Sequence, residues 1–170
     1  AAWAAAAQAA PVAVVGDVSG KGLIAAMRVS MILGVLGRED CTEPGGILRN
    51  LNEVLRNDGQ PGFTTACSVR LESDGRYAIA NAGHIAPYID GREVETPPAL
   101  PLGLAGEQQY QVVTGRLAAG QKLVLVSDGG VEARSAAGEL FGFGRLDALS
   151  LQPAQQIAET ARQFGQEDDI

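Results

Sequence analysis

The sequence predicts a mixed α+β fold, with helices and antiparallel strands in one chain. Apolar residues recur at steps of three and four over residues 23–36 and again over 47–55, which is the period of a helix with one packed face. Residues 63–71 and 77–82 read as strands, and the Ser-Asp-Gly triplet at 73–75 supplies the tight turn of a hairpin between them. Two neighbouring helices followed by a β-hairpin therefore form the framework of the prediction.

The first helix is expected to pack one face on the core. The spacing assigns to that face Leu23, Ala26, Met27, Ser30, Met31 and either Leu33 or Gly34. The second helix is expected to begin near Thr42 and Pro44 and to end at the Asn-Asp-Gly triplet 57–59.

The remaining elements follow from short apolar runs and turn residues. A buried strand is predicted over 11–15, running into Gly16-Asp17. Further predicted elements are a hairpin around the Asp-Gly pair at 90–91, strands over 110–117 and 122–127, and a helix over 153–164. Residues 1–10, almost all alanine, carry no signal that predicts a fold.

Length and composition fit one compact domain. The chain has 170 residues, of which 46% are hydrophobic and 19% charged, enough apolar material for a substantial core. We expect a single domain over residues 1–170. Because the chain lacks an initiator Met and stops directly after Asp168-Asp169-Ile170, we also expect it to be truncated at both ends.

Charge and cysteine content exclude several partners and compartments. A formal net charge of −7, without any basic cluster, argues against binding to nucleic acid. The sequence contains neither an apolar run long enough for a membrane span nor a secretory leader. Cys41 and Cys67 have no metal-binding spacing and are expected to be reduced thiols, which favours the cytoplasm.

Carboxylates follow three separate apolar segments of the sequence. These are Asp17, Asp128 and the pair Asp168-Asp169. Adjacent strands would bring them together, and a cluster of carboxylates needs cations to neutralise it; all-oxygen ligation suits Mg²⁺ or Mn²⁺. Two such ions could activate a water molecule and neutralise a phosphoryl group under attack. Spacing alone equally allows these aspartates to be ordinary turn residues.

The wording of the motifs resembles the stage II sporulation E type phosphatases, which belong to the type 2C class. The resemblance covers residues 11–170. It is carried by GDVSGKG at 16–22, FTTACSVRL at 63–71, YAIANAGHIAPYI at 77–89, PLGL at 101–104, LVLVSDGGVEAR at 123–134, FG at 141–142 and EDDI at 167–170, in that order.

This resemblance implies a fold and an activity. The fold would be a two-sheet antiparallel β-sandwich flanked by paired helices, and the activity would be metal-dependent hydrolysis of phosphoserine or phosphothreonine on a protein. The usual substrate in such a family is a phosphorylated anti-sigma-factor antagonist, so control of a sigma factor is the implied biology. The resemblance also admits a homodimer, and upstream sensor domains are common companions.

The resemblance assigns metal ligands residue by residue. Asp17 would bridge two ions, Mn²⁺ or Mg²⁺, and the Val18 backbone carbonyl would complete one coordination shell. Asp128 and Asp168 would bind the other ion, and Asp169 is a weaker candidate. Asp17, Asp128 and Asp168 are therefore also the expected catalytic residues.

One region departs from the family pattern. The family carries a Gly-Gly-Asp motif, with a nearby aromatic and a second Asp, on the strand before the first match. If Trp3 is that aromatic, the acidic positions fall on Ala2 and Ala5. A ligand would then be missing, and the alternative function is a catalytically weak or inactive phosphatase-fold domain for regulation or interaction.

Three polar residues near the motifs have open roles. His84 could be a general acid, but bracing the hairpin near the site is the favoured interpretation. Related enzymes place their proposed acid directly after the bridging aspartate, and Ser19 occupies that neighbourhood here. Lys21 could attract a phosphate or could face solvent.

Overall fold

The chain folds into two compact units, each described here by itself. The computed structural model describes residues 3–5, 11–38 and 41–165. Unit 1 comprises residues 1–84 and 96–116, and unit 2 comprises residues 85–95 and 117–170. Both units combine an antiparallel sheet with helices, so the predicted α+β class is confirmed. That residues 1–170 act as one phosphatase domain stays a prediction.

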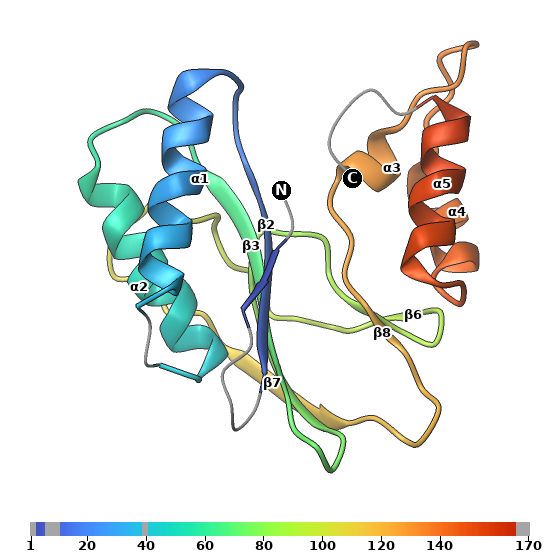
Figure 1. Ribbon diagram of the computed structural model, residues 1–170, viewed down its shortest axis with the longest axis horizontal. Coiled ribbons are helices and arrows are strands. Elements are labelled where there is room, and N and C mark those ends of the chain that lie inside the picture. The colour runs from blue at the N-terminus through green and yellow to red at the C-terminus, as the bar shows by residue number, and fades with distance from the viewer. Residues whose placement is uncertain (1–2, 6–10, 39–40, 166–170) are drawn as a thin grey trace. The chain divides into compact units, whose positions relative to one another are not determined.

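Unit 1 is built on a five-stranded antiparallel sheet with strand order β1-β2-β3-β4-β7 (Figure 1). Its strands are β1 (Trp3–Ala5), β2 (Val12–Val18), β3 (Thr64–Leu71), β4 (Arg76–Ala82) and β7 (Val112–Arg116). The predicted hairpin is the β3–β4 pair. Its turn is stabilised by Asp74, whose side chain accepts hydrogen bonds from the backbone N–H and the guanidinium of Arg76.

Two helices cover one face of this sheet: α1 (Leu23–Leu36) and α2 (Pro44–Asn57) (Figure 1). The sequence predicted both. Glu43 caps α2, because its carboxylate accepts hydrogen bonds from the free N–H groups of Gly45 and Gly46, at 3.2 and 2.5 Å. Pro44 occupies the first turn, where its missing N–H costs nothing.

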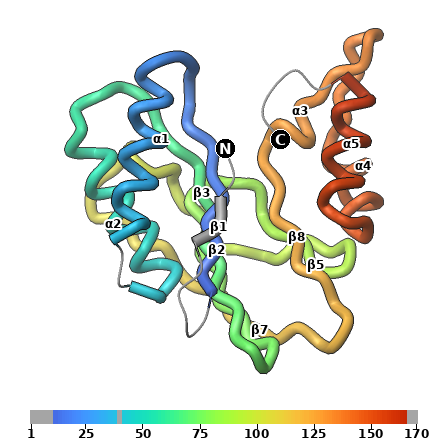
Figure 2. Tube along the Cα trace, in the orientation of Figure 1, coloured from blue at the N-terminus to red at the C-terminus, as the bar shows by residue number. Residues whose placement is uncertain are grey.

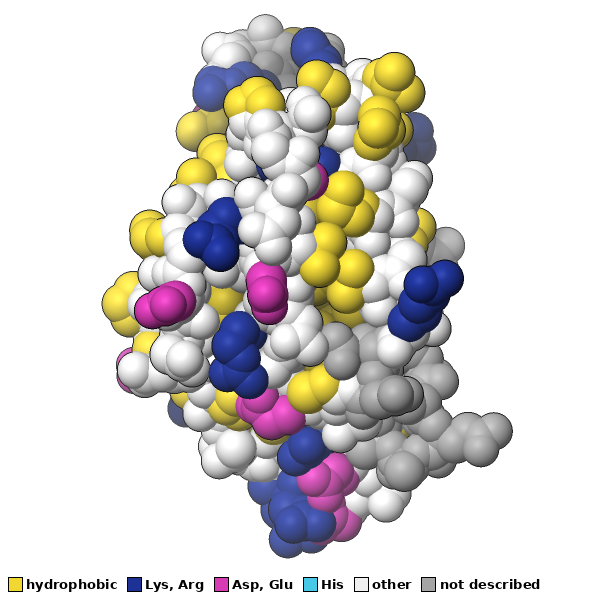
Figure 3. All heavy atoms as spheres, turned by 90° about the vertical axis from the view of Figure 1, so that its left-hand side faces the viewer, with side chains coloured by type: hydrophobic (Ala, Val, Ile, Leu, Met, Phe, Trp, Pro, Cys, Tyr) yellow, Lys and Arg dark blue, Asp and Glu magenta, His cyan; other side chains and the backbone are white. Residues whose placement is uncertain are grey.

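Most of the predicted face of α1 does not pack on the core, although Met31, which was assigned to it, does. Leu23, Met27 and Leu33, assigned to the packed face, are 76%, 61% and 41% exposed, and the outward side of this pair of helices carries hydrophobic side chains (Figure 3). The buried residues are Arg28 and Ile32. Apart from Arg28 the helix carries no charge, so its apolar period cannot distinguish the inner side from the outer one.

The core of unit 1 lies between the helices and the sheet. α2 contributes its apolar stripe, and the strands contribute small side chains that let the helix approach closely. The central buried residues are Val14, Ile32, Ile47, Leu48, Leu51, Leu55, Ala66, Ala80, Ala82, Leu102 and Tyr110.

Asn52 on α2 holds the segment that carries PLGL against this core. It is 3% exposed; its amide donates to the Ala105 carbonyl at 2.9 Å, and its oxygen accepts from the Gly103 N–H at 2.8 Å. We expect Asn52→Ala to lower the free energy of unfolding by about 1–3 kcal/mol, because two half-buried backbone groups lose their partners. Urea denaturation measures this. The exposed neighbour Glu53→Ala is the matched control, and equal losses in both variants would contradict the assignment.

The described part of unit 2, up to residue 165, contains a small antiparallel sheet and three helices (Figure 2). The strands, in the order β6-β5-β8, are β5 (Tyr88–Ile89), β6 (Arg92–Glu93) and β8 (Leu123–Val124). The helices are α3 (Gly129–Glu132), α4 (Gly142–Leu149) and α5 (Ala154–Phe164). Tyr88, Val124, Val131, Leu146 and Ile157 form its core.

Two predictions for unit 2 need correction. The strand predicted over 122–127 ends at Val124, because its partner β5 has only two residues and the ladder stops where the partner stops. Helices α3 and α4 were not predicted. The hairpin at Asp90-Gly91 and the helix α5 are as predicted. Across the described parts of both units, no helix has the length and apolar character needed to cross a membrane.

Candidate metal centre

Asp17, the expected bridging ligand, lies near the carboxyl end of β2. The antiparallel β2–β3 register places Asp17 opposite Thr65 and Val18 opposite Thr64. Both Asp17 and Val18 are half-buried. The strand thus holds the backbone at these two positions by its ladder, while the carboxylate stays accessible enough to meet a cation.

The motif segments that carry the resemblance meet around this strand end. Thr64 and Leu102 exchange two backbone hydrogen bonds, of 3.0 and 2.8 Å, so the PLGL segment docks beside β3. Ala66 forms a bridge with Gly83, which brings in the NAGH turn. Segments far apart in the sequence therefore converge on the portion of β3 that pairs with Gly16, Asp17 and Val18.

His84 braces this arrangement. Its Nδ1 lies 2.9 Å from Thr65 Oγ1, on the residue opposite Asp17. Asn81 holds the turn around His84, accepting from the His84 N–H at 2.8 Å and donating to the His84 carbonyl at 2.9 Å. These contacts agree with the bracing role favoured from the sequence. Thr65 and Asn81 were not singled out there, since neither residue type carries a distinctive signal.

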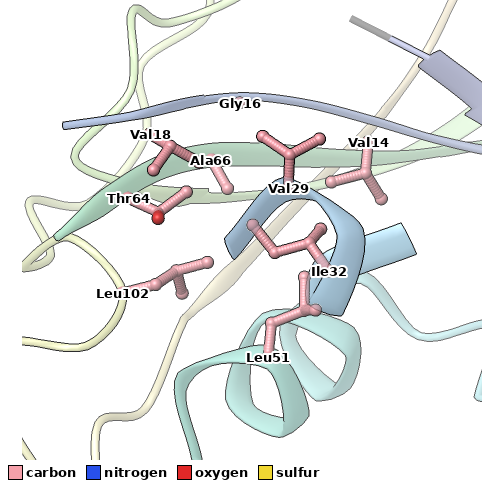
Figure 4. A pocket seen from close by; sticks show the side chains of 9 residues that line it. All are labelled: Val14, Gly16, Val18, Val29, Ile32, Leu51, Thr64, Ala66 and Leu102. Atoms are coloured by element: carbon pink, nitrogen blue, oxygen red, sulfur yellow. The ribbon is translucent and has the colours of Figure 1, made fainter. Parts of the chain in front are cut away.

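A small cavity lies behind the same strand end (Figure 4). It measures about 30 Å³, and its lining is almost wholly apolar, with Val18 and Ala66 from the sheet, Ile32 from α1 and Leu51 from α2. Thr64 Oγ1 is buried and has no hydrogen-bond partner within the described part of the chain. A space of this size holds about one water molecule, so the cavity belongs to the core and is no substrate site.

Asp128 belongs to unit 2 and lies where α3 begins. Its backbone carbonyl accepts hydrogen bonds from the N–H groups of Val131 and Glu132, both at 2.9 Å, and its side chain is half-buried. The sequence predicted that Asp128 would follow directly on a strand. Instead β8 ends at Val124, and an irregular segment separates it from Asp128.

The other expected ligand positions lie at the two ends of the chain. Asp168 and Asp169 fall outside the described residues, as does Ala2. Ala5 lies on β1 opposite Val12, so this strand offers no carboxylate at that position. Among residues 3–5, 11–38 and 41–165, no three His, Cys, Asp or Glu side chains gather into a ready metal cage.

The expected donors nevertheless fit Mn²⁺ or Mg²⁺ in their chemistry. Asp17 and Asp128 supply carboxylate oxygens and Val18 supplies a carbonyl oxygen, which are the hard ligands that these cations prefer. Both aspartates are half-buried. Asp17 belongs to unit 1 and Asp128 to unit 2.

The two cysteines differ in accessibility, which gives a test of the core. Cys67 on β3 is fully buried and burial raises the pKa of its thiol from 9.0 to about 12, whereas Cys41 is half-buried. We expect the folded protein at pH 8 to react with one equivalent of a disulfide reagent, at Cys41, and with two after unfolding in urea. A Cys41→Ser variant should then show no reaction while folded, and rapid reaction of both thiols would contradict the buried position.

The same shift has a consequence for pH dependence. The folded state holds the Cys67 thiol neutral, so its contribution to stability is complete below pH 9.0, the ordinary pKa, and is lost progressively as the pH rises toward about 12.

Comparisons with known proteins define the class first by fold. The structure resembles the SiaA-PP2C domain of Pseudomonas aeruginosa with a TM-score of 0.78 and 21% identity, covering 98% of this chain and 76% of that one. It also resembles the catalytic domain of the serine/threonine protein phosphatase PstP, solved with two manganese ions, with a TM-score of 0.63 and 14% identity, covering 98% and 86%. The fold is that of the PP2C phosphatases.

Residues 9–170 match the family model described as Stage II sporulation protein E (SpoIIE), and the chain belongs to this family. A curated relative, the phosphoserine phosphatase RsbU of Bacillus subtilis (strain 168), is 30% identical over 135 residues. That match covers 74% of this chain and 40% of RsbU, so the chain spans less than half the length of this relative.

Proposed function

We propose that this chain is a metal-dependent protein phosphatase domain that hydrolyses phosphoserine or phosphothreonine on a regulatory protein. Asp17, the Val18 carbonyl, Asp128 and Asp168 would hold two Mn²⁺ or Mg²⁺ ions, with Asp169 as a weaker candidate. The observation that carries the proposal is the braced strand end, where three motif segments converge beside Asp17 and Val18 in a chain of the SpoIIE family.

The chain's own residues would present oxygen ligands and fix their direction. Pairing with Thr64 in the β2–β3 ladder fixes the backbone of Val18. The hydrogen bond between Thr65 and His84 braces the opposite strand, β3. When bound, the ions would neutralise phosphoryl charge and activate water. No protein nucleophile is then needed.

The substrate and location extend this proposal. We infer a phosphorylated anti-sigma-factor antagonist as the substrate, since the curated relative is named a phosphoserine phosphatase and family members commonly act in such circuits. With such a substrate, the protein would act in the cytoplasm. No nucleic acid or membrane partner is proposed.

A homodimer stays part of the proposal. The exposed apolar side of α1, with Leu23, Ile24 and Met27, offers a surface that a second copy could cover. Sedimentation of the full-length protein over a range of concentrations tests it, and a monomer at the highest concentration would remove this part.

The test of the activity is phosphate release by the full-length protein from a phosphoserine peptide and from p-nitrophenyl phosphate, with and without Mn²⁺. Metal-dependent turnover is expected. Failure of both substrates at saturating Mn²⁺ would favour the second candidate, a regulatory domain that retains the fold without activity. If Trp3 is the aromatic of the family motif, alanines stand at the two acidic positions, 2 and 5, and this keeps the second candidate.

A further inference from the structure

A buried ion pair joins α1 to the end of α2. Arg28 donates from Nε to Asp58 Oδ2 at 3.1 Å and from Nη2 to Asp58 Oδ1 at 3.3 Å, and both side chains are only 3% exposed. Arg28 Nη2 also donates to the Gln60 carbonyl at 2.7 Å. Arg28 therefore fixes both the residue that ends α2 and the loop that follows it.

That loop is in turn bonded to the strand end that carries the candidate ligands. The Ser19 N–H donates to the Phe63 carbonyl at 2.9 Å, and the Phe63 N–H donates to Ser19 Oγ at 2.8 Å. Ser19 directly follows Val18, so these bonds extend the β2–β3 ladder one step beyond the strand. We call the set Arg28, Asp58, Gln60, Phe63 and Ser19 the Arg28 clamp.

Two residues of the clamp, Ser19 and Arg28, pack closely around Gly62. A Cβ on this residue, whose φ is 117°, would lie 2.9 Å from Ser19 Oγ and 3.2 Å from Arg28 Nη1. Ser19 Oγ and the Arg28 guanidinium thus both lie close to this point, which leaves no room for a side chain at position 62.

The connection from Ser19 to α1 contains two glycines, at positions 20 and 22. Gly20 and Gly22 have φ values of 91° and 80°, and a Cβ at either position would meet nothing within 4 Å. The two ends of this segment are held by neighbouring elements. One end is Ser19, bonded to Phe63, and the other is α1, held by Arg28.

Stability alone does not account for a charge buried in this way. Replacing a buried ion pair with apolar residues is often neutral or favourable for stability. In the described part of the chain, Arg28 Nη1 is buried without a hydrogen-bond partner, which adds to the cost. The Arg28–Asp58 pair is therefore better explained by the positions that it gives to α1, the end of α2 and the following loop.

We propose that Arg28 is a positioning residue: through the clamp it sets the backbone path at Asp17 and Val18 and thereby the affinity of the centre for Mn²⁺. The metal part of this inference rests on the proposed function. The mechanical part, from Arg28 to Ser19, stands on the contacts alone.

The experiment uses the full-length protein with the double substitution Arg28→Met and Asp58→Leu, which removes both charges together. We expect the melting temperature to be retained, because no lone charge is left buried. Amide hydrogen exchange at Ser19 and Phe63, measured without metal, should accelerate about tenfold or more. The Kd for Mn²⁺ from calorimetry should rise about 10- to 100-fold, the range typical of residues that orient metal ligands, and kcat should fall while KM for p-nitrophenyl phosphate is unchanged.

Arg76→Met is the matched control, because it removes an exposed arginine that is ion-paired with Glu72 and Asp74 in the same unit. It should change neither exchange at Ser19 nor the Kd for Mn²⁺. If the double variant does not fold, Arg28→Lys replaces it: lysine keeps the charge but cannot make the paired contacts, so exchange and Kd should shift in the same direction but less.

Two results overturn the inference. The first is unchanged hydrogen exchange at Ser19 and Phe63 in a folded Arg28 variant. That result would show that Arg28 does not hold the backbone at Ser19. The second is faster exchange with an unchanged Kd for Mn²⁺, which would remove the metal part. If the wild-type protein binds no Mn²⁺ and has no turnover, the proposed function and the metal part fail, while exchange at Ser19 still decides the mechanical part.

Discussion

Asp17→Asn is expected to lower the Mn²⁺-dependent kcat/KM for p-nitrophenyl phosphate by at least about 100-fold. Loss of a residue that only orients a metal ligand already costs about 10- to 100-fold, and Asp17 is expected to contact both ions itself. The amide keeps the size of the side chain but loses its charge, so the β2–β3 ladder opposite Thr65 should be undisturbed. Steady-state kinetics over a Mn²⁺ titration measure the effect.

The control for this substitution is Asp74→Asn. Asp74 is an exposed carboxylate in the β3–β4 turn, where the Arg76 N–H, and more weakly its guanidinium, lower the pKa of the side chain. This variant should retain wild-type kinetics. An Asp17→Asn protein with activity within about threefold of wild type would mean that Asp17 holds no metal.

Gly16→Ala is expected to destabilise the protein by about 1–3 kcal/mol, the usual cost of forcing atoms into a packed site. A Cβ at position 16 would lie 2.6 Å from the backbone oxygen of Thr65, so β2 and β3 would have to separate directly beside Asp17. We therefore expect weaker Mn²⁺ binding together with the loss of stability. Urea denaturation and calorimetry measure the two effects.

Gly34→Ala, in the same unit, is expected to raise stability where Gly16→Ala lowers it. Gly34 lies inside α1, and a Cβ there meets nothing within 4 Å, so alanine should stabilise the helix by about 0.5–1 kcal/mol. If both glycine variants were equally stable, the close approach of β2 and β3 at Gly16 would not be a real constraint.

The local periodicity predicted most elements because each has a clear repeat and clear ends. Helix α2 illustrates this: its apolar spacing, Pro44 and the turn after Asn57 together define it. Helix α1 shows the limit of such patterns. Its extent was predicted correctly but its inner face was not, because the residue that marks that face is Arg28, whose partner Asp58 lies 30 residues away in sequence.

For the candidate site, the sequence predicted Asp17 together with its strand but gave the wrong setting for Asp128. The apolar run 122–127 contains enough residues for a longer strand. Strand length depends on the partner, however, and β5 pairs with only two of them. Periodicity likewise could not predict α3 and α4, which are short and glycine-rich. No local signal in the sequence predicted the convergence of FTTACSVRL, NAGH and PLGL.

The order of the two units along the chain constrains how the protein can be made and dissected. Each unit is assembled from two stretches, since residues 85–95 leave unit 1 and residues 96–116 return to it. Neither unit can therefore be expressed as one uninterrupted piece of the gene. During synthesis β5 emerges from the ribosome well before β8. The backbone groups of β5 that pair with β8 therefore stay unpaired until β8 has been made. Trimming the chain at either end to obtain a minimal fragment would remove part of one unit and leave the other intact.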